Sequence, residues 1–317
     1  MPAGHSHTTS LEHGIVAIDT EYARPLQDAS HLIVENGRAA FVDTGVNSSV
    51  PMLLSALQQS NVDPAAVDYL FLTHIHLDHA GGAGLLMQSL PNARCVIHPR
   101  GAPHMVDPTK LMAGTKAVYG EEKTAQLYGE ILPIDAARID VAEDGETFSL
   151  HGRALQAFFT EGHARHHYCL SDPSSEGVFT GDSFGVSYRE LDTAAGEFIF
   201  PTTTPVHFDP AEAHKSVDRI MAYAPRRLYL THYSEVGNLE RLAADMHQGI
   251  DAFVKIAHEH ANSENRTAAI QEEMFNYFVA GLEAHGFAAD RDTMWSVLSL
   301  DVNLNTQGIE VWLDRNG

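Results

Sequence analysis

The stretch Phe71–Gly84, FLTHIHLDHAGGAG, places three histidines and an aspartate within six residues. It begins at the end of an apolar run, VDYLFLT, that predicts a buried strand. Because alternate side chains of a strand share a face, His74 and His76 are expected to point together where the strand ends. Asp78 and His79 follow in the turn, and three glycines after them allow close approach of the backbone. This crowding predicts a site for a pair of metal ions.

The rest of the first half alternates short β-branched runs with helical patterns. Strands are predicted at 14–19, 31–36, 39–43, 67–73 and 93–99, and helices at 48–60 and 82–90. Strand patterns return within 146–160, 166–172, 177–182 and 226–232. Asp209 as N-cap and Pro210 after it predict a helix over 208–223. The mixture indicates sheets covered by helices, an α/β layered fold.

The C-terminal part of the chain has a helical pattern without strand-like runs. From about Asn238 to Leu300 the pattern is helical throughout, which predicts a catalytic domain over 1–237 and a helical region over 238–317 packed on it. Met274 and Phe278 belong to a group of large apolar residues there, expected to form core; covering the pocket or pairing with a second copy of the chain is the alternative.

The composition of the chain disfavours several classes of partner and metal site. The formal net charge of −22 disfavours nucleic acid and anionic membranes as partners. Two cysteines provide neither a disulfide framework nor a thiolate-rich zinc site, and no export signal or long apolar run occurs, so a cytoplasmic location is expected. Histidine is frequent, with 20 residues. Those in polar helical contexts, His247 and His258 among them, are expected to be ordinary surface residues.

Three further candidate ligands follow strand-like runs. His163 lies in TEGHARHH, Asp182 in FTGDSF and His232 in YLTHYSE. With the first cluster they form the series H-x-H-x-D-H, G-H, G-D and T-H. Over residues 14 to 235 this series resembles the metallo-β-lactamase superfamily. The resemblance implies a four-layer αβ/βα sandwich with the helical C-terminal appendage added.

The resemblance also implies a ligand set. One metal is then held by His74, His76 and His163, and the other by Asp78, His79 and His232. Asp182 is expected to bridge them. Asp43, in FVDTG, resembles the aspartate that supports the site from behind the ligands.

The implied activity is hydrolysis of an ester, lactone or thioester of a small molecule. A hydroxide held between two divalent ions attacks the carbonyl, and Asp78 accepts a proton. Zinc is the first expectation, with iron or manganese as alternatives. Asp182 separates this pattern from the true β-lactamases and groups it with glyoxalase II and the acyl-homoserine lactone lactonases. Flavodiiron proteins usually place an acidic residue where this chain has His76.

Three other functions stay open. Related ribonucleases make phosphodiester hydrolysis one alternative, although the acidic composition opposes a long polyanion. A persulfide dioxygenase with one iron on His74, His163 and Asp182 is the second. A metal-holding sensor without turnover is the third, and the intact ligand set argues against it.

Substrate contacts are expected near the ligands. His166 and His167 are candidates for orienting a ligand or meeting the substrate, and His207 is a candidate pocket residue. The segment 183–206 is long for a connection in a compact domain, and it is either a substrate lid or a packed hairpin. In the lid interpretation, Tyr188 supplies apolar contact and Arg189 meets an anionic group.

Overall fold

A computed structural model describes residues 7–203 and 205–316. The chain forms two compact units. The first comprises Met1–Phe159, His166–Gly181 and Pro225–Glu235, and the second comprises Thr160–Arg165, Asp182–Ala224 and Val236–Gly317. In the described part, none of the helices combines the length and apolar character needed to cross a membrane.

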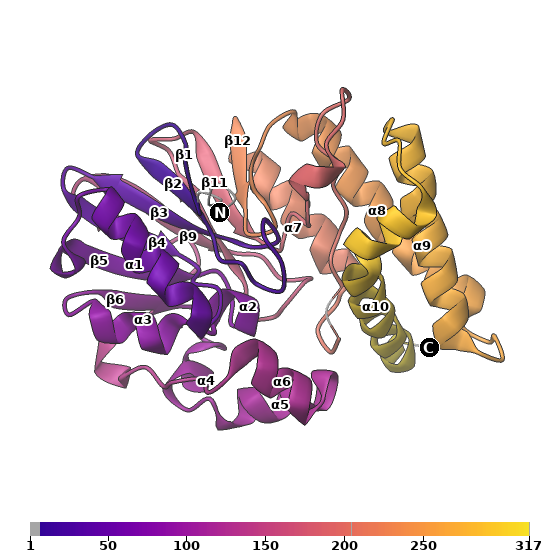
Figure 1. The fold of residues 1–317 in the computed structure, drawn as a ribbon, viewed down its shortest axis with the longest axis horizontal. Coiled ribbons are helices and arrows are strands. Elements are labelled where there is room, and N and C mark those ends of the chain that lie inside the picture. Colours follow the sequence, from indigo (N-terminus) through magenta and orange to yellow (C-terminus); the bar gives the residue numbers. More distant parts are fainter. Residues whose placement is uncertain (1–6, 204, 317) are drawn as a thin grey trace, which may run out of the picture. The chain divides into compact units, whose positions relative to one another are not determined.

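The first unit is built on two sheets (Figure 1). One has the order β1 (Thr8–Ser10), β2 (Ile15–Asp19), β3 (Ala29–Glu35), β4 (Arg38–Val42), β5 (Val67–Leu72), β6 (Arg94–Ile97) and β7 (Ile139–Val141). Its first three pairings are antiparallel and its last three parallel. The other has the order β13 (Ser234–Val236), β12 (Arg227–Leu230), β11 (Gly177–Gly181), β10 (Tyr168–Asp172), β9 (Arg153–Phe159) and β8 (Thr147–Leu150). Each predicted strand run therefore corresponds to a strand in one of these sheets.

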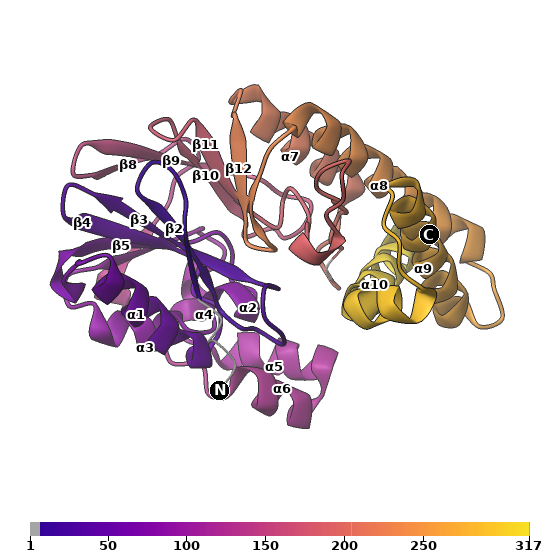
Figure 2. The ribbon, with the colours of Figure 1, turned by 45° about the horizontal axis from the view of Figure 1, so that its top comes forward.

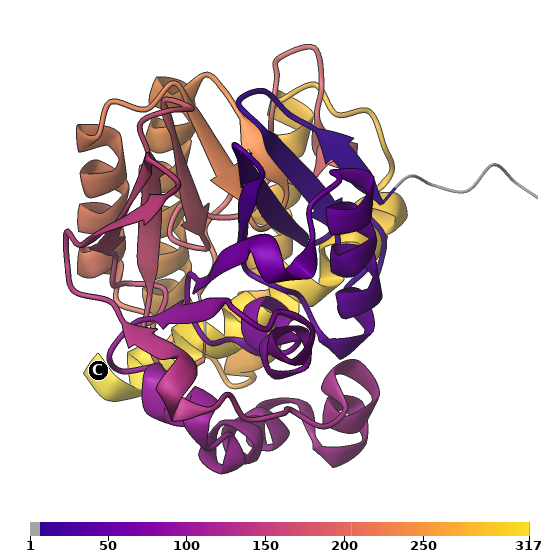
Figure 3. The same ribbon diagram turned by 90° about the vertical axis from the view of Figure 1, so that its left-hand side faces the viewer.

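Alternation along the strands builds two cores. Leu32 and Phe41 face a core that contains α1 (Val50–Gln59) and α3 (Ala83–Ser89), and these helices lie on one face of the first sheet (Figure 2). Their neighbours Ile33 and Ala40 face a second core shared with the other sheet. Figure 3 shows the two sheets facing each other. The period of two in these strands thus sorts apolar side chains to both faces.

The first unit also contains helices that the sequence patterns did not reveal. They are α2 (Leu77–Ala80), α4 (Ala102–Val106), α5 (Thr109–Tyr119) and α6 (Glu121–Tyr128). Neither α5 nor α6 has a strong apolar stripe, because most of their residues are half-buried or exposed. Without a continuous apolar face the periodicity signal is weak.

The second unit contains four helices in its described residues. They are α7 (Pro210–Ala222), α8 (Leu239–His260), α9 (Arg266–Ala284) and α10 (Arg291–Asn316). Asp209 accepts hydrogen bonds from the backbone amides of Ala211 and Glu212, as expected for the N-cap. Met274 and Phe278 are fully buried, which agrees with a core role. The α/β fold with a helical C-terminal region is confirmed, whereas the boundary at 237 stays a prediction.

His31 gives the first unit a measurable pH dependence. It lies in β3 on the face toward the second sheet, with its ring centroid 5.4 Å from that of Phe179 and 5.8 Å from that of Tyr229. Burial lowers its pKa to about 4, against the opposing charge of Asp43. The folded state therefore keeps His31 neutral at a pH where the unfolded chain, with an ordinary histidine pKa of about 6.5, binds a proton.

We expect this histidine to contribute to acid destabilisation. The unfolded state binds more protons below pH 6.5, so stability falls as the pH decreases toward 4, by about 3 kcal/mol from this one group. His31→Leu removes the titration, and urea unfolding should show a shallower loss of stability between pH 7 and pH 4. The exposed His258, changed to Gln, serves as control and should keep the wild-type slope. Parallel slopes for all three proteins would contradict the prediction.

Candidate metal centre

The segment after β5 carries the largest group of candidate ligands. His76 is the N-cap of α2, so Asp78 and His79 lie in the first turn of that short helix. The chain passes so close to a neighbouring loop that a Cβ on Gly82 would lie 2.8 Å from the carbonyl oxygen of Val46. The absence of a side chain at this glycine therefore allows the helix to begin directly behind the histidines.

Asp78, His79 and His232 form a group within the first unit. Each offers one ligand atom, and these atoms lie within 4.8 Å of one another. The Oδ2 of Asp78 is 4.0 Å from His79 Nε2 and 3.7 Å from His232 Nε2. The two imidazoles are buried, and the carboxylate is 23% exposed. Two imidazole nitrogens and a carboxylate around one point are a suitable donor set for a divalent transition metal.

The other ring nitrogens of these histidines have fixed partners. His79 Nδ1 lies 2.8 Å from Asp43 Oδ2, and His232 Nδ1 lies 2.8 Å from the carbonyl oxygen of Gln27. Both partners accept, so Nδ1 carries the hydrogen in each neutral ring, and Nε2 carries the lone pair. This tautomer is the one in which Nε2 binds a metal.

Asp43 connects three parts of the first unit. It is fully buried and accepts from the backbone amide of Thr73 at 2.8 Å, from the hydroxyl of Thr231 at 2.9 Å, and from His79. Thr73 precedes His74, and Thr231 precedes His232. One carboxylate thus fixes the backbone beside two candidate ligands and the ring of a third.

His74 and His76 form a pair beside this group. His74 Nε2 lies 2.7 Å from His76 Nδ1. The ring of His167 stacks on that of His74 at 4.8 Å, and the ring of His166 does so at 6.1 Å. Both candidate neighbours named in the sequence therefore pack against a candidate ligand within the first unit.

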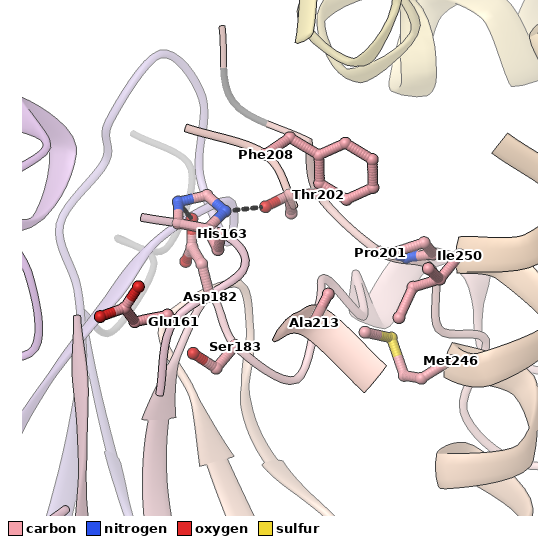
Figure 4. Close-up of a pocket in the computed structure, with 10 residues that line it drawn as sticks. All are labelled: Glu161, His163, Asp182, Ser183, Pro201, Thr202, Phe208, Ala213, Met246 and Ile250. Carbon is pink, nitrogen blue, oxygen red and sulfur yellow. Dashed lines mark hydrogen bonds and ion pairs between the residues drawn. The ribbon is translucent and has the colours of Figure 1, made fainter. Parts of the chain in front are cut away.

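His163 and Asp182 lie together in the second unit. His163 Nε2 is 3.3 Å from Asp182 Oδ2, and His163 Nδ1 shares a hydrogen bond of 2.5 Å with the hydroxyl of Thr202 (Figure 4). The loop that carries His163 is bound to the start of α7, because the amide of Asp209 donates to the carbonyl of Gly162. Thr202 thus holds the ring of His163, and the contact at Gly162 holds the backbone next to it.

A small pocket adjoins His163 and Asp182 in the second unit. It is small, with room inside for about one water molecule. Its apolar lining comes from Pro201, Phe208, Ala213, Met246 and Ile250, and its polar lining from Glu161, His163, Asp182, Ser183 and Thr202. Figure 4 shows Met246 and Ile250 on one side and the two candidate ligands on the other. Candidate metal ligands thus border an apolar wall.

The segment 183–206, of which Thr204 lies outside the described residues, shows hairpin pairing. Val186 and Phe200 exchange two backbone hydrogen bonds of 2.9 and 3.1 Å. Tyr188 is buried and its hydroxyl donates to Asp301 of α10 at 3.1 Å. Of the two interpretations that the sequence left open, the packed hairpin is the one that this pairing favours.

Arg189 and His207 are placed away from the pocket lining. Arg189 forms an ion pair with Asp192 at 3.4 Å and donates to the carbonyl oxygen of Ser187. His207 is half-buried in the turn before Phe208, which does line the pocket. Substrate contacts by these two residues stay a prediction.

Sequence reasoning missed a buried carboxyl group, Asp28. It is completely buried, and neither of its oxygens has a hydrogen-bond partner among the described residues. Burial raises its pKa to about 8, although the nearby His232 and His79 act in the opposite direction. An aspartate at the start of the apolar strand sequence DASHLIV was the available signal.

Three tyrosines near Asp78 were also missed. Tyr22 and Tyr128 share a hydrogen bond of 2.7 Å between their hydroxyls. Burial, reinforced by the charge of Asp78, raises the pKa of the half-buried Tyr119 to about 12. These phenols therefore stay protonated at neutral pH and are available as hydrogen-bond donors. Tyr119 and Tyr128 belong to α5 and α6, which the sequence patterns did not predict, so the ligand motifs gave no sign of them.

Comparisons with known proteins identify a family and related chains. The family model for the metallo-beta-lactamase superfamily matches residues 23–232. The metallo-beta-lactamase fold-containing protein ST1585 of Sulfurisphaera tokodaii is 28% identical over 195 residues, which are 60% of this chain and 67% of that protein. An atrochrysone carboxyl ACP thioesterase of Aspergillus fumigatus is 27% identical over 234 residues, which are 71% of this chain and 59% of the thioesterase.

Solved structures show the same fold. A crystal structure of ST1585 from Sulfolobus tokodaii has a TM-score of 0.65 at 21% identity and covers 94% of this chain and 98% of its own. A metallo-beta-lactamase family protein of Thermus thermophilus, TTHA1429, has a TM-score of 0.68 at 17% identity, with 97% and 95% covered. The fold that the motif series implied is confirmed.

Proposed function

Because the chain belongs to the metallo-β-lactamase superfamily, we propose that it is a dinuclear metal-dependent hydrolase acting on an ester, lactone or thioester of a small molecule. The group formed by Asp78, His79 and His232 carries this proposal. Its ligand atoms lie within 4.8 Å of one another, and both imidazoles have their Nδ1 hydrogens committed elsewhere. Such a group is built to receive a cation through Nε2 and the carboxylate.

The second ion is assigned to His74, His76 and His163, with Asp182 shared between both ions. Chain connectivity supports this. A Cβ on Gly181 would lie 2.7 Å from the hydroxyl oxygen of Thr73, the residue before His74. Asp182 follows Gly181 directly in the sequence.

His163 is close in sequence to a histidine of the first unit. It precedes His166 by three residues, and the ring of His166 lies 6.1 Å from that of His74. Five histidines and two aspartates make a donor set that suits zinc, iron and manganese, with zinc as the first choice. When bound, two such ions lower the pKa of water and polarise a carbonyl oxygen.

The residues of this chain have separate tasks in the proposed reaction. Asp78, the most exposed of its group, accepts a proton at Oδ2 from the attacking water. Asp43 and the carbonyl of Gln27 keep His79 and His232 in one orientation.

The pocket of the second unit suggests the substrate's chemistry. Its apolar wall, which includes Met246 and Ile250, begins beside His163 and Asp182. An apolar acyl group suits such a wall better than a polyanion does. The net charge of −22 also opposes phosphodiesters of nucleic acid. Similarity to a protein named as an ACP thioesterase favours a thioester.

The proposed location is the cytoplasm. Both cysteines, Cys95 and Cys169, are buried, and no disulfide joins them in the described part of the chain. Chains of oxidising compartments more often use their cysteines in disulfides.

A substrate panel on metal-counted protein tests the proposal. Acyl thioesters, esters and lactones of increasing chain length, together with bis(p-nitrophenyl) phosphate, are assayed with zinc, iron or manganese. We expect two ions per chain and turnover of carbonyl substrates with apolar acyl groups. Turnover of the phosphodiester alone, or full activity with a single iron, would overturn the assignment. The variant His79→Ala, assayed in parallel, separates activity of this centre from contamination.

A further inference from the structure

Two helices of the second unit present the same motif to each other. The sequence HKSVD places His214 and Asp218 four residues apart on α7, and HQGID places His247 and Asp251 four residues apart on α8. Residues four apart lie on one face of a helix. The two pairs therefore form a cluster of two imidazoles and two carboxylates outside the seven ligands assigned above.

The two imidazoles meet through the same ring atom. His214 Nδ1 lies 2.6 Å from His247 Nδ1, and the rings are stacked with centroids 5.0 Å apart and planes at 9°. Each Nε2 points to a carboxylate of the opposite helix. His214 Nε2 is 3.1 Å from Asp251 Oδ1, and His247 Nε2 is 3.2 Å from Asp218 Oδ1.

This arrangement leaves a position for a cation. A carboxylate accepts only, so each Nε2 carries the hydrogen in the neutral ring, and each Nδ1 then carries a lone pair. Two lone pairs that face each other at 2.6 Å repel unless a positive charge lies between them. The geometry therefore calls for either a shared proton or a metal ion at the two Nδ1 atoms.

We propose that His214 and His247 bind a divalent transition-metal cation through their Nδ1 atoms, with Asp251 and Asp218 fixing the tautomers from behind. Imidazole pairs with carboxylate partners on the second nitrogen are a recurring arrangement around zinc. Bonds of about 2.1 Å in a tetrahedral site require the nitrogens to separate to about 3.4 Å, which a small rotation of two side chains on a helix surface supplies.

Exposure agrees with an open site. The two histidine side chains are 28% and 31% exposed, so the pair lies at the surface, where water can complete the coordination. The ion would link α7 to α8 close to the pocket, since Ala213 and Met246, which line it, are the chain neighbours of the two histidines. Binding at this site is independent of the proposed hydrolase function.

Zinc titration tests the proposal. Protein is first saturated with metal and freed of excess, so that a tight centre is already filled, and zinc is then added in a calorimeter. We expect one additional ion per chain and a rise in melting temperature with zinc. The double variant His214→Gln/His247→Gln should lose that step, and Asp251→Asn should weaken it about tenfold to a hundredfold.

The control is His258→Gln, which removes an exposed histidine from α8, the helix that also carries His247. This variant should still bind the additional zinc ion. Circular dichroism checks that every variant folds. A wild-type protein that binds no additional zinc would overturn the proposal in favour of a shared proton. Persistence of the step in the folded double variant would overturn it as well. Absence of hydrolysis in the substrate panel would contradict the proposed hydrolase function and not the metal site at His214 and His247.

Discussion

Asp182→Asn is expected to lower turnover at least about a hundredfold or to remove one of the two ions of the proposed centre. The side chain is 7% exposed, and its Oδ2 lies 3.3 Å from His163 Nε2. In the proposed centre this carboxylate lies between two cations and offsets part of their repulsion. Asparagine keeps the shape but removes the charge, and several kilocalories per mole of charge stabilisation are at stake.

The measurement combines metal analysis with turnover on the best substrate of the panel. Asp245→Asn, which removes a carboxylate paired with Arg241 elsewhere in the second unit, controls for the change in net charge and should keep both ions. Unchanged metal content together with unchanged turnover in Asp182→Asn would exclude the bridging role. A loss shared equally by the control would point to general destabilisation.

Asp43→Asn is expected to weaken metal binding about tenfold to a hundredfold and to destabilise the fold by about 3 kcal/mol. The carboxylate accepts from Thr73, Thr231 and His79 at once. An amide nitrogen in place of one oxygen faces a donor and leaves it unsatisfied in a fully buried position. His79 also loses the partner that holds its hydrogen on Nδ1.

Asparagine is the informative replacement at this position. Asp43 has φ of 59°, in the left-handed region that asparagine tolerates better than most residues. The backbone is therefore kept while the charge is removed. Urea unfolding of metal-free protein measures the stability change, and competition with a chelator measures metal affinity. Wild-type affinity with lowered stability would assign Asp43 a purely structural role, and no change in either quantity would contradict both expectations.

Local patterns predicted those parts of the fold that local physics determines. Short β-branched runs identified β3 and β4, and adjacent side chains of these strands face different cores. Asp209 and Pro210 marked the start of α7, because capping involves only neighbouring residues. The helices α5 and α6 were not predicted, because they lack the continuous apolar face that gives a helical period in the sequence.

The sequence predicted which residues are candidate ligands, but it did not predict how their side chains are oriented. His74, His76, Asp78 and His79 stand at a strand end that the sequence itself shows. The tautomer of His232 depends on Gln27, 205 residues away along the chain, and no local pattern contains that contact. The unpartnered carboxyl of Asp28 and the hairpin pairing of Val186 with Phe200 likewise follow from packing.

His247 shows the division most clearly. Its sequence context, a polar stretch of a helix, predicts an ordinary surface residue, and each HxxxD motif alone holds one imidazole and one carboxylate. Only the packing of α7 against α8 brings His247 to His214, 33 residues away, and crosses each ring to the other helix's carboxylate. Because periodicity is local, the amino-acid sequence indicates which residue types are available at each helix face or strand end. Which of these residues meet depends on the packing of whole helices and sheets, because only that packing makes side chains from distant segments neighbours.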